Sequence, residues 1–344
     1  MANVKNERPN KTRKKDIKKI IGIIILAILL IVYVVDYFQE TSQTTETQNE
    51  QTIAETSIGQ NEAQQATGAT SNHSVEGELI LTMIDVGQAD SFLLMQNGET
   101  ALIDCGTRST GKDVVEYLKD IGITRIDYVF GTHPHDDHMG GMYDVITNFE
   151  IGKIIIPKVE ENITTNWYIK LMTEIVNGKY DVEYPKVGDI YNLGKATMKV
   201  IGPLSPANGN KNNYSTVLKV SFGEMDVIMT GDAETKVEQD ILASGENIDA
   251  EILKVGHHGS DTSSSEEFLD AISPDYGLIS CKVGNKYKHP IASTMEKLKA
   301  RNVEVYRTDE NSTVVATITT DSVAFDKQPG DYLSGPELEM MEGK

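Results

Sequence analysis

Residues 132–138 read Thr-His-Pro-His-Asp-Asp-His, and this stretch constrains the chain more than any other. It places three of the seven histidines within six residues, beside two aspartates. Imidazole nitrogens and carboxylate oxygens are the ligands that divalent cations such as Zn²⁺ and Mn²⁺ accept. The apolar run 126–130 predicts a strand directly before the cluster, so we expect a loop at a strand's carboxyl end, where α/β folds commonly build sites. A solvated polar loop is the competing interpretation, and metal-type residues after later strands argue against it.

The first 38 residues have the pattern of a membrane anchor. Residues 1–19 carry eight Lys and Arg against two acidic residues, and 20–38 are mostly Ile, Leu and Val with no charge before Asp36. This length is at the short end for a helix that spans a bilayer, and basic flanks stay on the cytoplasmic side. We expect a single-pass transmembrane helix in the cell membrane, with a cytoplasmic N-terminus and an extracellular remainder. A cleaved signal peptide is the alternative, but Val34-Val-Asp-Tyr-Phe is a poor cleavage site.

Composition divides the rest of the chain into a linker, one domain and a tail. Residues 39–76 are rich in Gln, Thr, Glu, Asn and Ser, so they cannot bury enough apolar surface to offset the entropy of ordering. We expect a disordered linker there, a single domain over 77–326 and an acidic C-terminal tail over 327–344. The formal net charge of −20 opposes broad binding to nucleic acid, whose affinity comes mainly from phosphate contacts.

Short apolar runs alternate with helical patterns in this domain, which predicts a mixed α/β fold. Strands are expected at 79–84, 91–95, 101–104, 126–130, 153–157, 197–201, 216–220, 226–230, 252–255 and 276–280 and near 303, 314 and 323. Helices are expected at 112–120, 142–149, 233–243, 266–272 and 292–301. Cys105 and Cys281 each follow a predicted strand, and the sequence leaves open whether they form a disulfide or remain buried thiols.

Six further motifs accompany the histidine cluster. They are Ile84-Asp-Val-Gly-Gln-Ala-Asp-Ser, Leu102-Ile-Asp-Cys-Gly, Asn212-Asn-Tyr-Ser-Thr-Val-Leu, Met229-Thr-Gly-Asp, Leu253-Lys-Val-Gly-His-His-Gly-Ser and Tyr287-Lys-His-Pro. In this order the set resembles the metallo-β-lactamase superfamily, whose motif is His-x-His-x-Asp-His, and especially its ComEC-type branch, the hydrolase domain of competence proteins that take up DNA. The resemblance implies that residues 77–326 form an αββα metallo-β-lactamase sandwich, here preceded by the predicted transmembrane helix and linker.

The resemblance also implies a set of metal ligands. They are His133 and His135 for a first ion, Asp137, His138 and His257 for a second, and Asp232 as a bridge between the two. The expected cofactor is one or two divalent ions, zinc or manganese, whose bound hydroxide attacks phosphorus or a carbonyl carbon. Only one of the adjacent His257 and His258 is expected to be a ligand, because their side chains point in different directions, and His257 is preferred. Asp104 is expected to orient a ligand histidine.

The chain departs from the β-lactamases proper at the third motif. They have a further histidine ligand there, whereas this chain has no histidine between His138 and His257. Asn213 and Ser215 occupy the region, so the first site is richer in oxygen and suits Mn²⁺ or Mg²⁺ better than Zn²⁺. We expect Asn213 and Ser215 to bind substrate or metal, although a turn capped by its own side chains explains them equally well.

Other polar residues near these motifs are candidates for catalysis and substrate binding. The catalytic candidates are Asp137, His258 and His289, and the further candidates for substrate binding are Lys282, Lys286 and Lys288. A histidine beside the metal ions can protonate a leaving group or hold a phosphate oxygen. Three lysines close together can hold a phosphate, and a solvated loop is the alternative. A surface histidine is likewise the alternative for His289.

These features favour a membrane-anchored extracellular hydrolase that cleaves phosphodiesters, as a phosphodiesterase or nuclease. Its substrate would be nucleic acid or a phosphodiester of the cell wall or of a small molecule, and residues 20–38 would contact the lipid bilayer. No motif identifies a protein partner. A β-lactamase-like or other amide or ester hydrolase is the first alternative, which the missing histidine disfavours. A non-enzymatic surface protein that retains the fold is the second, and the complete set of implied ligands argues against it.

Overall fold

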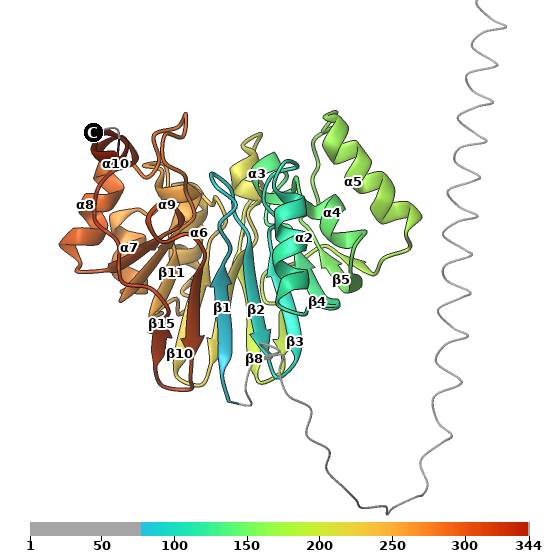
Figure 1. Ribbon diagram of the computed structural model, residues 1–344, viewed down its shortest axis with the longest axis horizontal. Helices are drawn as coiled ribbons and strands as arrows, with labels where there is room; N and C mark the ends of the chain where they lie inside the picture. The colour runs from blue at the N-terminus through green and yellow to red at the C-terminus, as the bar shows by residue number, and fades with distance from the viewer. Residues whose placement is uncertain (1–76, 343–344) are drawn as a thin grey trace, which may run out of the picture. The chain divides into compact units, whose positions relative to one another are not determined.

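Within residues 77–342, which the computed structural model describes, the strands form two β-sheets that pack face to face, with helices on both outer sides (Figure 1). The first sheet has the spatial order β15 (Val323–Phe325), β14 (Val314–Ile318), β1 (Leu79–Met83), β2 (Phe92–Gln96), β3 (Glu99–Ile103), β4 (Arg125–Phe130), β5 (Glu150–Ile155) and β6 (Val182–Glu183). The second has the order β13 (Glu304–Arg307), β12 (Tyr276–Ile279), β11 (Ile252–Lys254), β10 (Met225–Met229), β9 (Val217–Phe222), β8 (Ala196–Gly202) and β7 (Ile190–Leu193).

Helices and short helical turns connect these strands. The α-helices are α2 (Gly111–Asp120), α3 (Asp136–Met139), α4 (Met142–Ile146), α5 (Asn166–Asn177), α6 (Thr235–Ser244), α7 (Glu266–Ile272), α8 (Ala292–Ala300), α9 (Thr308–Asn311) and α10 (Gly335–Glu342). The 3₁₀ turns are η1 (Lys211–Tyr214) and η2 (Gly256–Gly259). The layers are helix, sheet, sheet and helix, so the predicted αββα sandwich is confirmed.

Each sheet combines antiparallel pairs with a parallel half. In the first sheet β3, β4 and β5 run parallel, and in the second β10, β11, β12 and β13 do. Parallel neighbours need crossover connections, here through helices such as α2, α6, α7 and α8. The carboxyl ends of parallel strands consequently share one edge of their sheet, where the intervening loops can carry a site.

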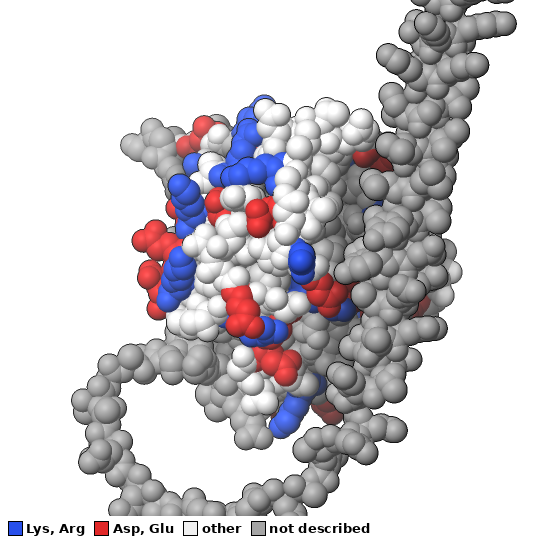
Figure 2. All heavy atoms as spheres, turned by 90° about the vertical axis from the view of Figure 1, so that its right-hand side faces the viewer, with Lys and Arg blue, Asp and Glu red and all other residues white. Residues whose placement is uncertain are grey.

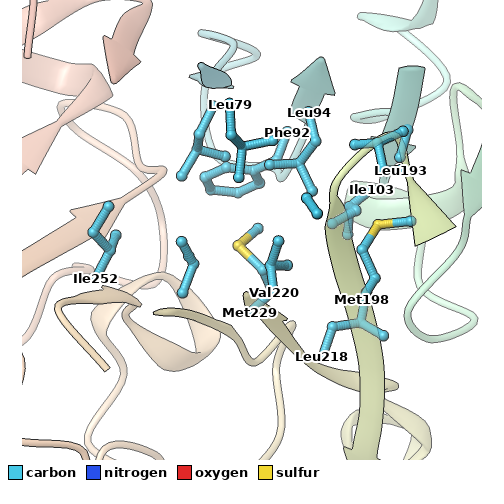
Figure 3. Close-up of a cluster of buried hydrophobic side chains, with 14 of the residues drawn as sticks. Leu79, Phe92, Leu94, Ile103, Leu193, Met198, Leu218, Val220, Met229 and Ile252 are labelled. Carbon is cyan, nitrogen blue, oxygen red and sulfur yellow. The ribbon is translucent and has the colours of Figure 1, made fainter. Parts of the chain in front are cut away.

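The side chains between the sheets form the central core. Strand residues alternate between the two faces of a sheet, so Phe92 and Leu94 of β2 point to the opposite sheet, while Leu93 points to the helices. Figure 3 shows such inward side chains from both sheets, among them Leu218 and Val220 of β9. This apolar interface anchors the strands whose ends carry the site.

Each outer face has its own apolar layer. The first sheet packs against α2 and α4 through residues such as Val114, Leu118 and Val145, and the second packs against α6, α7 and α8. Cys105 lies in the first layer and Cys281 in the second, and both are buried free thiols. The structure therefore supports two buried thiols and not a disulfide.

The structure adds elements that the sequence did not predict. Helix α5 and strands β6 and β7 fill the stretch 166–193, in which we matched no motif. The expected acidic tail is also corrected, since residues 327–342 pack on the domain and end in α10. Tyr332 donates its hydroxyl proton to Val303 O at 2.7 Å and packs beside the second helical layer. Apolar Tyr and Leu side chains within this acidic stretch supply the surface that holds it.

Two predictions concern a different part of the chain. The transmembrane helix at 20–38 and the linker at 39–76 lie outside the described residues. Among residues 77–342, no helix has the length and apolar character needed to cross a membrane.

Candidate metal centre

The sequence motifs meet at one edge of the sandwich, at the carboxyl ends of strands from both sheets. β4 leads into the histidine loop 131–135 and then α3, β10 leads into Asp232, and β11 leads into η2. Thr216 N donates to Thr132 O at 3.0 Å, which joins the two sheets beside the site. Side chains that extend from strand ends in this way are held in fixed positions by the sheets.

His133 lies between two other predicted ligands, His135 and Asp232. His133 Nε2 lies 2.9 Å from His135 Nδ1 and 3.8 Å from Asp232 Oδ2. His133 is fully buried, with its Nδ1 3.2 Å from Thr132 Oγ1. Because Thr132 donates its hydroxyl proton to Asp104, it accepts the proton of His133 Nδ1. The lone pair of His133 Nε2 is thereby turned toward the other two side chains, as metal binding requires.

A second group forms around the other side of Asp232. Its Oδ2 lies 3.2 Å from His138 Nε2 and 3.8 Å from His258 Nε2. His258 Nε2 is also 3.7 Å from Asp137 Oδ2. Asp232 is therefore shared between the two groups, which is the position of a bridging carboxylate.

The opposite nitrogens of both histidines are held by acceptors. His138 Nδ1 lies 2.7 Å from Asp104 Oδ2, and His258 Nδ1 donates to Ser280 O at 2.9 Å. A proton held on Nδ1 leaves the Nε2 lone pair free for a metal ion. The structure thus places Asp104 where it was expected, behind a ligand histidine. Its Oδ1 also accepts from Thr132 N at 2.8 Å, which fixes the start of the histidine loop.

The residues present fit divalent ions. Four sets of three side chains bring possible ligand atoms within 4.8 Å of one another, namely His133, His138 and Asp232; Asp137, His138 and His258; Asp90, Asp232 and His258; and Asp90, Asp104 and His138. His258 Nε2 and Asp232 Oδ1 are buried and make no hydrogen bond to the described residues. Buried polar atoms without partners are costly, and a cation among them would satisfy their lone pairs.

The carboxylates strongly perturb the histidines. Burial alone would lower the pKa of His258, but Asp232 and Asp90 outweigh it and raise that pKa to about 10. Burial would raise the pKa of Asp232, yet His138 and His258 outweigh it and hold the pKa well below its usual value. For His133, burial dominates and its pKa falls well below the usual value, with His138 adding to the effect. Such opposed shifts within a few ångström are typical of functional sites.

The two adjacent histidines differ from the prediction. His258 is buried and belongs to two of the possible ligand sets, whereas His257, like the predicted ligand His135, belongs to none. His257 Nε2 lies 3.6 Å from Asp232 Oδ2, and its Nδ1 lies 3.1 Å from Thr262 Oγ1. Both histidines have a left-handed backbone, with φ of 51° and 54°, which aims one ring inward and the other at the rim. The geometry therefore favours His258 as the ligand of the second ion, and His257 borders the cavity.

The sequence prediction missed a buried lysine. Lys254 is 1% exposed, and its Nζ lies 2.5 Å from Asp90 Oδ2, 2.8 Å from Gly231 O and 3.7 Å from Asp232 Oδ1. Burial would raise the pKa of Asp90, but Lys254 and His258 together lower it. The signal was a lysine within the apolar strand that leads to the paired histidines. A charge in such a strand requires a buried partner, and Asp90 in the first motif supplies it.

A cavity of about 310 Å³ opens onto this centre. Asn212 lines it, whereas Asn213 lines a neighbouring cavity with Tyr214. The predicted contact of Asn213 with this centre is therefore corrected to Asn212, because the 3₁₀ turn η1 points consecutive side chains to different sides. Ser215 is fully buried and accepts from Asp232 N at 3.0 Å, so it positions the bridging carboxylate rather than the substrate.

The late loop contributes His289 and Tyr287 to the cavity wall. Their rings stack at 5.7 Å, and burial together with His258 and His257 lowers the pKa of His289 to about 4. The predicted lysines are exposed and do not line the cavity; they are Lys282, Lys286 and Lys288. Lys286 nevertheless lies close, with its Nζ 4.7 Å from the centre of the Tyr287 ring.

Two similar curated proteins are bacterial. The chain is 31% identical over 261 residues to "ComE operon protein 3" of Bacillus subtilis, covering 70% of this chain and 33% of that protein. It is 29% identical over 236 residues to "Competence protein ComA" of Neisseria gonorrhoeae, covering 68% of this chain and 31% of that protein. The chain thus spans about a third of the length of these relatives. The predicted resemblance to ComEC-type proteins is confirmed.

One similar solved structure and one matching family model complete the comparisons. A solved structure described as Igni18, a metallo hydrolase from the archaeon Ignicoccus hospitalis, has a TM-score of 0.48 and 14% identity, covering 69% of this chain and 98% of that one. The family model described as the metallo-beta-lactamase superfamily matches residues 84–282, which is more than half of the chain. The chain therefore belongs to the metallo-β-lactamase superfamily, whose fold and metal-binding side chains it carries.

Proposed function

We propose that this protein is a metal-dependent phosphodiesterase, anchored in the cell membrane by residues 20–38 with its hydrolase domain outside the cell. Nucleic acid is the substrate class that we test first. The proposal rests on the superfamily fold, on the buried His and Asp groups and on the charge around the cavity.

The observation that carries the choice of substrate is a pair of lysines beside residues that line the cavity. Lys211 belongs to η1, beside Asn212 in the cavity wall, and its charge adds to the burial that lowers the pKa of His135. Lys286 stands over the Tyr287 ring on the other side. In a chain with a net charge of −20, two cations beside one cavity favour an anionic substrate such as a phosphodiester.

One face of the molecule supports a local rather than a broad contact with substrate. Figure 2 shows one face on which positive and negative side chains are interspersed. An interspersed face gives no continuous basic path for a nucleic-acid backbone. Recognition is therefore expected to concentrate at the cavity, where a single phosphodiester fits.

The chain's own residues have distinct tasks in this reaction. Bound divalent ions would activate water and neutralise the negative charge that develops on the phosphoryl oxygens. His133, His135 and Asp232 would hold the first ion, and the second would lie between Asp232, His138, His258 and Asp137. Asn212 and His289 line the cavity, where they can orient the phosphoryl oxygens. Lys211 and Lys286, which lie close to the cavity, attract the anionic substrate.

The similar competence proteins support nucleic acid as the first substrate to test. The name of one of them states competence, and the two are 31% and 29% identical to this chain over 70% and 68% of its length. Because fold and family do not fix a substrate, small phosphodiesters belong in the same assay.

The test is hydrolysis of bis-p-nitrophenyl phosphate and of single-stranded DNA by the whole purified chain with Mn²⁺, Mg²⁺ or Zn²⁺. We expect metal-dependent cleavage that is lost in Asp137→Ala, with thermal unfolding recorded to show that the variant is folded. A variant at the half-buried Lys327, which does not line the cavity, serves as a control: Lys327→Ala should keep activity. A folded, metal-loaded chain that cleaves neither substrate but opens an ester or a lactam would overturn the proposal.

The anchoring proposal is tested separately in cells. The chain should fractionate with membranes, and added protease should remove its hydrolase domain from intact cells whose outer layers are permeable. Deletion of residues 20–38 should release the protein from the membrane fraction. Recovery of the intact chain in the soluble fraction would contradict it.

A further inference from the structure

The loop of the first motif reaches the last histidine of the cavity through one side chain, Gln88. Its Oε1 accepts from the backbone nitrogen of Lys282 at 3.3 Å, and its Nε2 lies 3.4 Å from His289 Nδ1. Gln88 is partly buried, and His289 is 7% exposed.

These two contacts determine where His289 carries its proton. A backbone N–H can only donate, so the Gln88 oxygen must face Lys282 and the amide nitrogen must face His289. The amide nitrogen also only donates, so His289 Nδ1 must accept. The ring proton therefore resides on Nε2, the nitrogen that is left to face the cavity.

Neighbouring contacts keep this geometry fixed. Asn285 Nδ2 donates to His289 O at 2.6 Å, and Asn285 Oδ1 accepts from His289 N at 3.1 Å. Ser280 Oγ donates to Ala89 O, which ties the start of the late loop to the residue after Gln88. The Tyr287 ring stacks on His289 from the outside. His289 is thus held by contacts to its backbone, to one face of its ring and to its Nδ1.

We propose that Gln88 is a positioning residue that keeps His289 neutral with its proton on Nε2, so that His289 donates a hydrogen bond to a phosphoryl oxygen and transfers no proton. The inference rests on the proposed function and narrows it. It decides whether His289 protonates the leaving group or holds a phosphoryl oxygen. A donor aimed at an oxygen that gains negative charge stabilises the transition state. The electron pair of the breaking P–O bond then goes to a leaving oxygen whose proton comes from water.

The first test reads the proton directly and does not depend on activity. The whole chain is labelled with ¹⁵N-histidine, loaded with Zn²⁺ and examined by NMR, with His289→Gln used to assign the signal. We expect the signal of His289 to be that of a neutral ring with the proton on Nε2. A proton on Nδ1, or on both nitrogens at neutral pH, would overturn the proposal whether or not the protein cleaves phosphodiesters.

The matched variant is Gln88→Glu, which preserves shape and still accepts from Lys282 N. A carboxylate can only accept, so His289 must then carry its proton on Nδ1. We expect the NMR signal to change accordingly and kcat/KM for bis-p-nitrophenyl phosphate to fall at least about tenfold, since a single misplaced donor has effects of this size or larger. The exposed variant Gln328→Glu adds the same charge and should leave both unchanged. Loss of the Nε2 proton with full activity would contradict the proposed role of His289.

Two kinetic comparisons separate positioning from other roles. In the His289→Ala background, Gln88→Glu should lower kcat/KM by less than about twofold further. A residue that acts through His289 has no effect when His289 is absent. The loss in His289→Ala should also be the same for bis-p-nitrophenyl phosphate and for thymidylyl-thymidine, whose leaving group is poorer. A much larger loss with the poorer leaving group would instead make His289 a proton donor. If no substrate is cleaved by the wild-type chain, the proposed function fails while the NMR result still stands.

Discussion

At the scale of single residues, the centre depends on side chains that orient the predicted ligands. Asp104 is buried with a left-handed backbone, at φ of 61°, and contacts Thr132 and His138 at once. Such a conformation is uncommon outside glycine and is maintained only when surrounding contacts require it. One carboxylate therefore orients both the loop that carries the first histidine pair and the ligand of the second ion.

Replacement of Asp104 by asparagine tests this arrangement. An amide nitrogen turned to His138 Nδ1 would push the ring proton onto Nε2, the atom needed for the ion. We expect Asp104→Asn to weaken Zn²⁺ binding about 10- to 100-fold, the usual effect of losing such a partner. Titration calorimetry measures the affinity, and Asp127→Asn, whose carboxylate lies outside the site beside Arg125, is the control. Equal affinity in wild type and Asp104→Asn would show that His138 needs no orientation.

The raised pKa of His258 makes a second prediction, about pH. At about 10, this pKa means that the metal-free histidine holds a proton at neutral pH, and a metal ion must displace it. The pKa of His138 is also raised, because Asp232 and Asp104 outweigh burial. Metal affinity should therefore rise as pH increases from 6 to 8, with protons released on binding. Calorimetry in two buffers of different ionisation enthalpy counts those protons, and an affinity independent of pH would contradict the expectation.

At the scale of elements, the sequence was most informative where a motif and a hydrophobic pattern coincided. The strands before Asp104, His133 and Asp232 were predicted, because each is a short apolar run that ends in polar residues. Helix α5 was missed since its buried side is only Leu171 and Ile175, too few for a clear period. The sequence could not choose between His257 and His258, because the choice depends on backbone angles that only the folded loop sets.

Helix α10 shows a signal that was present but not used. Ser334 and Glu337 have the Ser-x-x-Glu spacing of a capping box, and Glu337 Oε2 accepts from both the nitrogen and the hydroxyl of Ser334. Pro336 lies in the first turn, where its missing N–H does no harm. The acidic composition of the segment concealed this helix start, so we predicted a tail.

The contact between α2 and the start of α4 depends on two glycines. A methyl group on Gly111 would lie 2.6 Å from the Gly141 Cα, a backbone atom that cannot move aside easily. We expect Gly111→Ala to lower the free energy of unfolding by about 1–3 kcal/mol, as overpacking typically does. Urea unfolding measures this, with the exposed Lys112→Ala on the same helix as control. Unchanged stability in Gly111→Ala would mean that the helices separate without cost.

At the scale of the whole molecule, the C-terminal segment closes the domain around the late loop. Arg307 is fully buried, pairs with Asp309 at 2.8 Å and donates to the carbonyl oxygens of Asp331 and Leu333. The start of α10 then returns to the site, since Gly335 N donates to Pro290 O at 2.9 Å. The second sheet, the C-terminal segment and the cavity wall are therefore one connected unit.

Removal of residues 331–344 tests this connection. The truncation removes two carbonyl acceptors of the buried Arg307 guanidinium. It also removes Tyr332, which packs on the second helical layer, and the contact of Gly335 beside His289. We expect the free energy of unfolding to fall by at least about 2 kcal/mol in urea titrations of the whole chain, the scale of a lost large buried side chain. Zn²⁺ content should persist in the folded fraction, because the segment contributes no side chain to the ligand sets. Phosphodiesterase activity should nevertheless fall after the truncation, because the His289 loop loses its outer support. The control Met341→Ser changes an exposed side chain of α10 and should preserve both properties. An unchanged free energy of unfolding after truncation would show that Arg307 finds sufficient partners within the two sheets. The C-terminal segment would then pack on the domain without stabilising it.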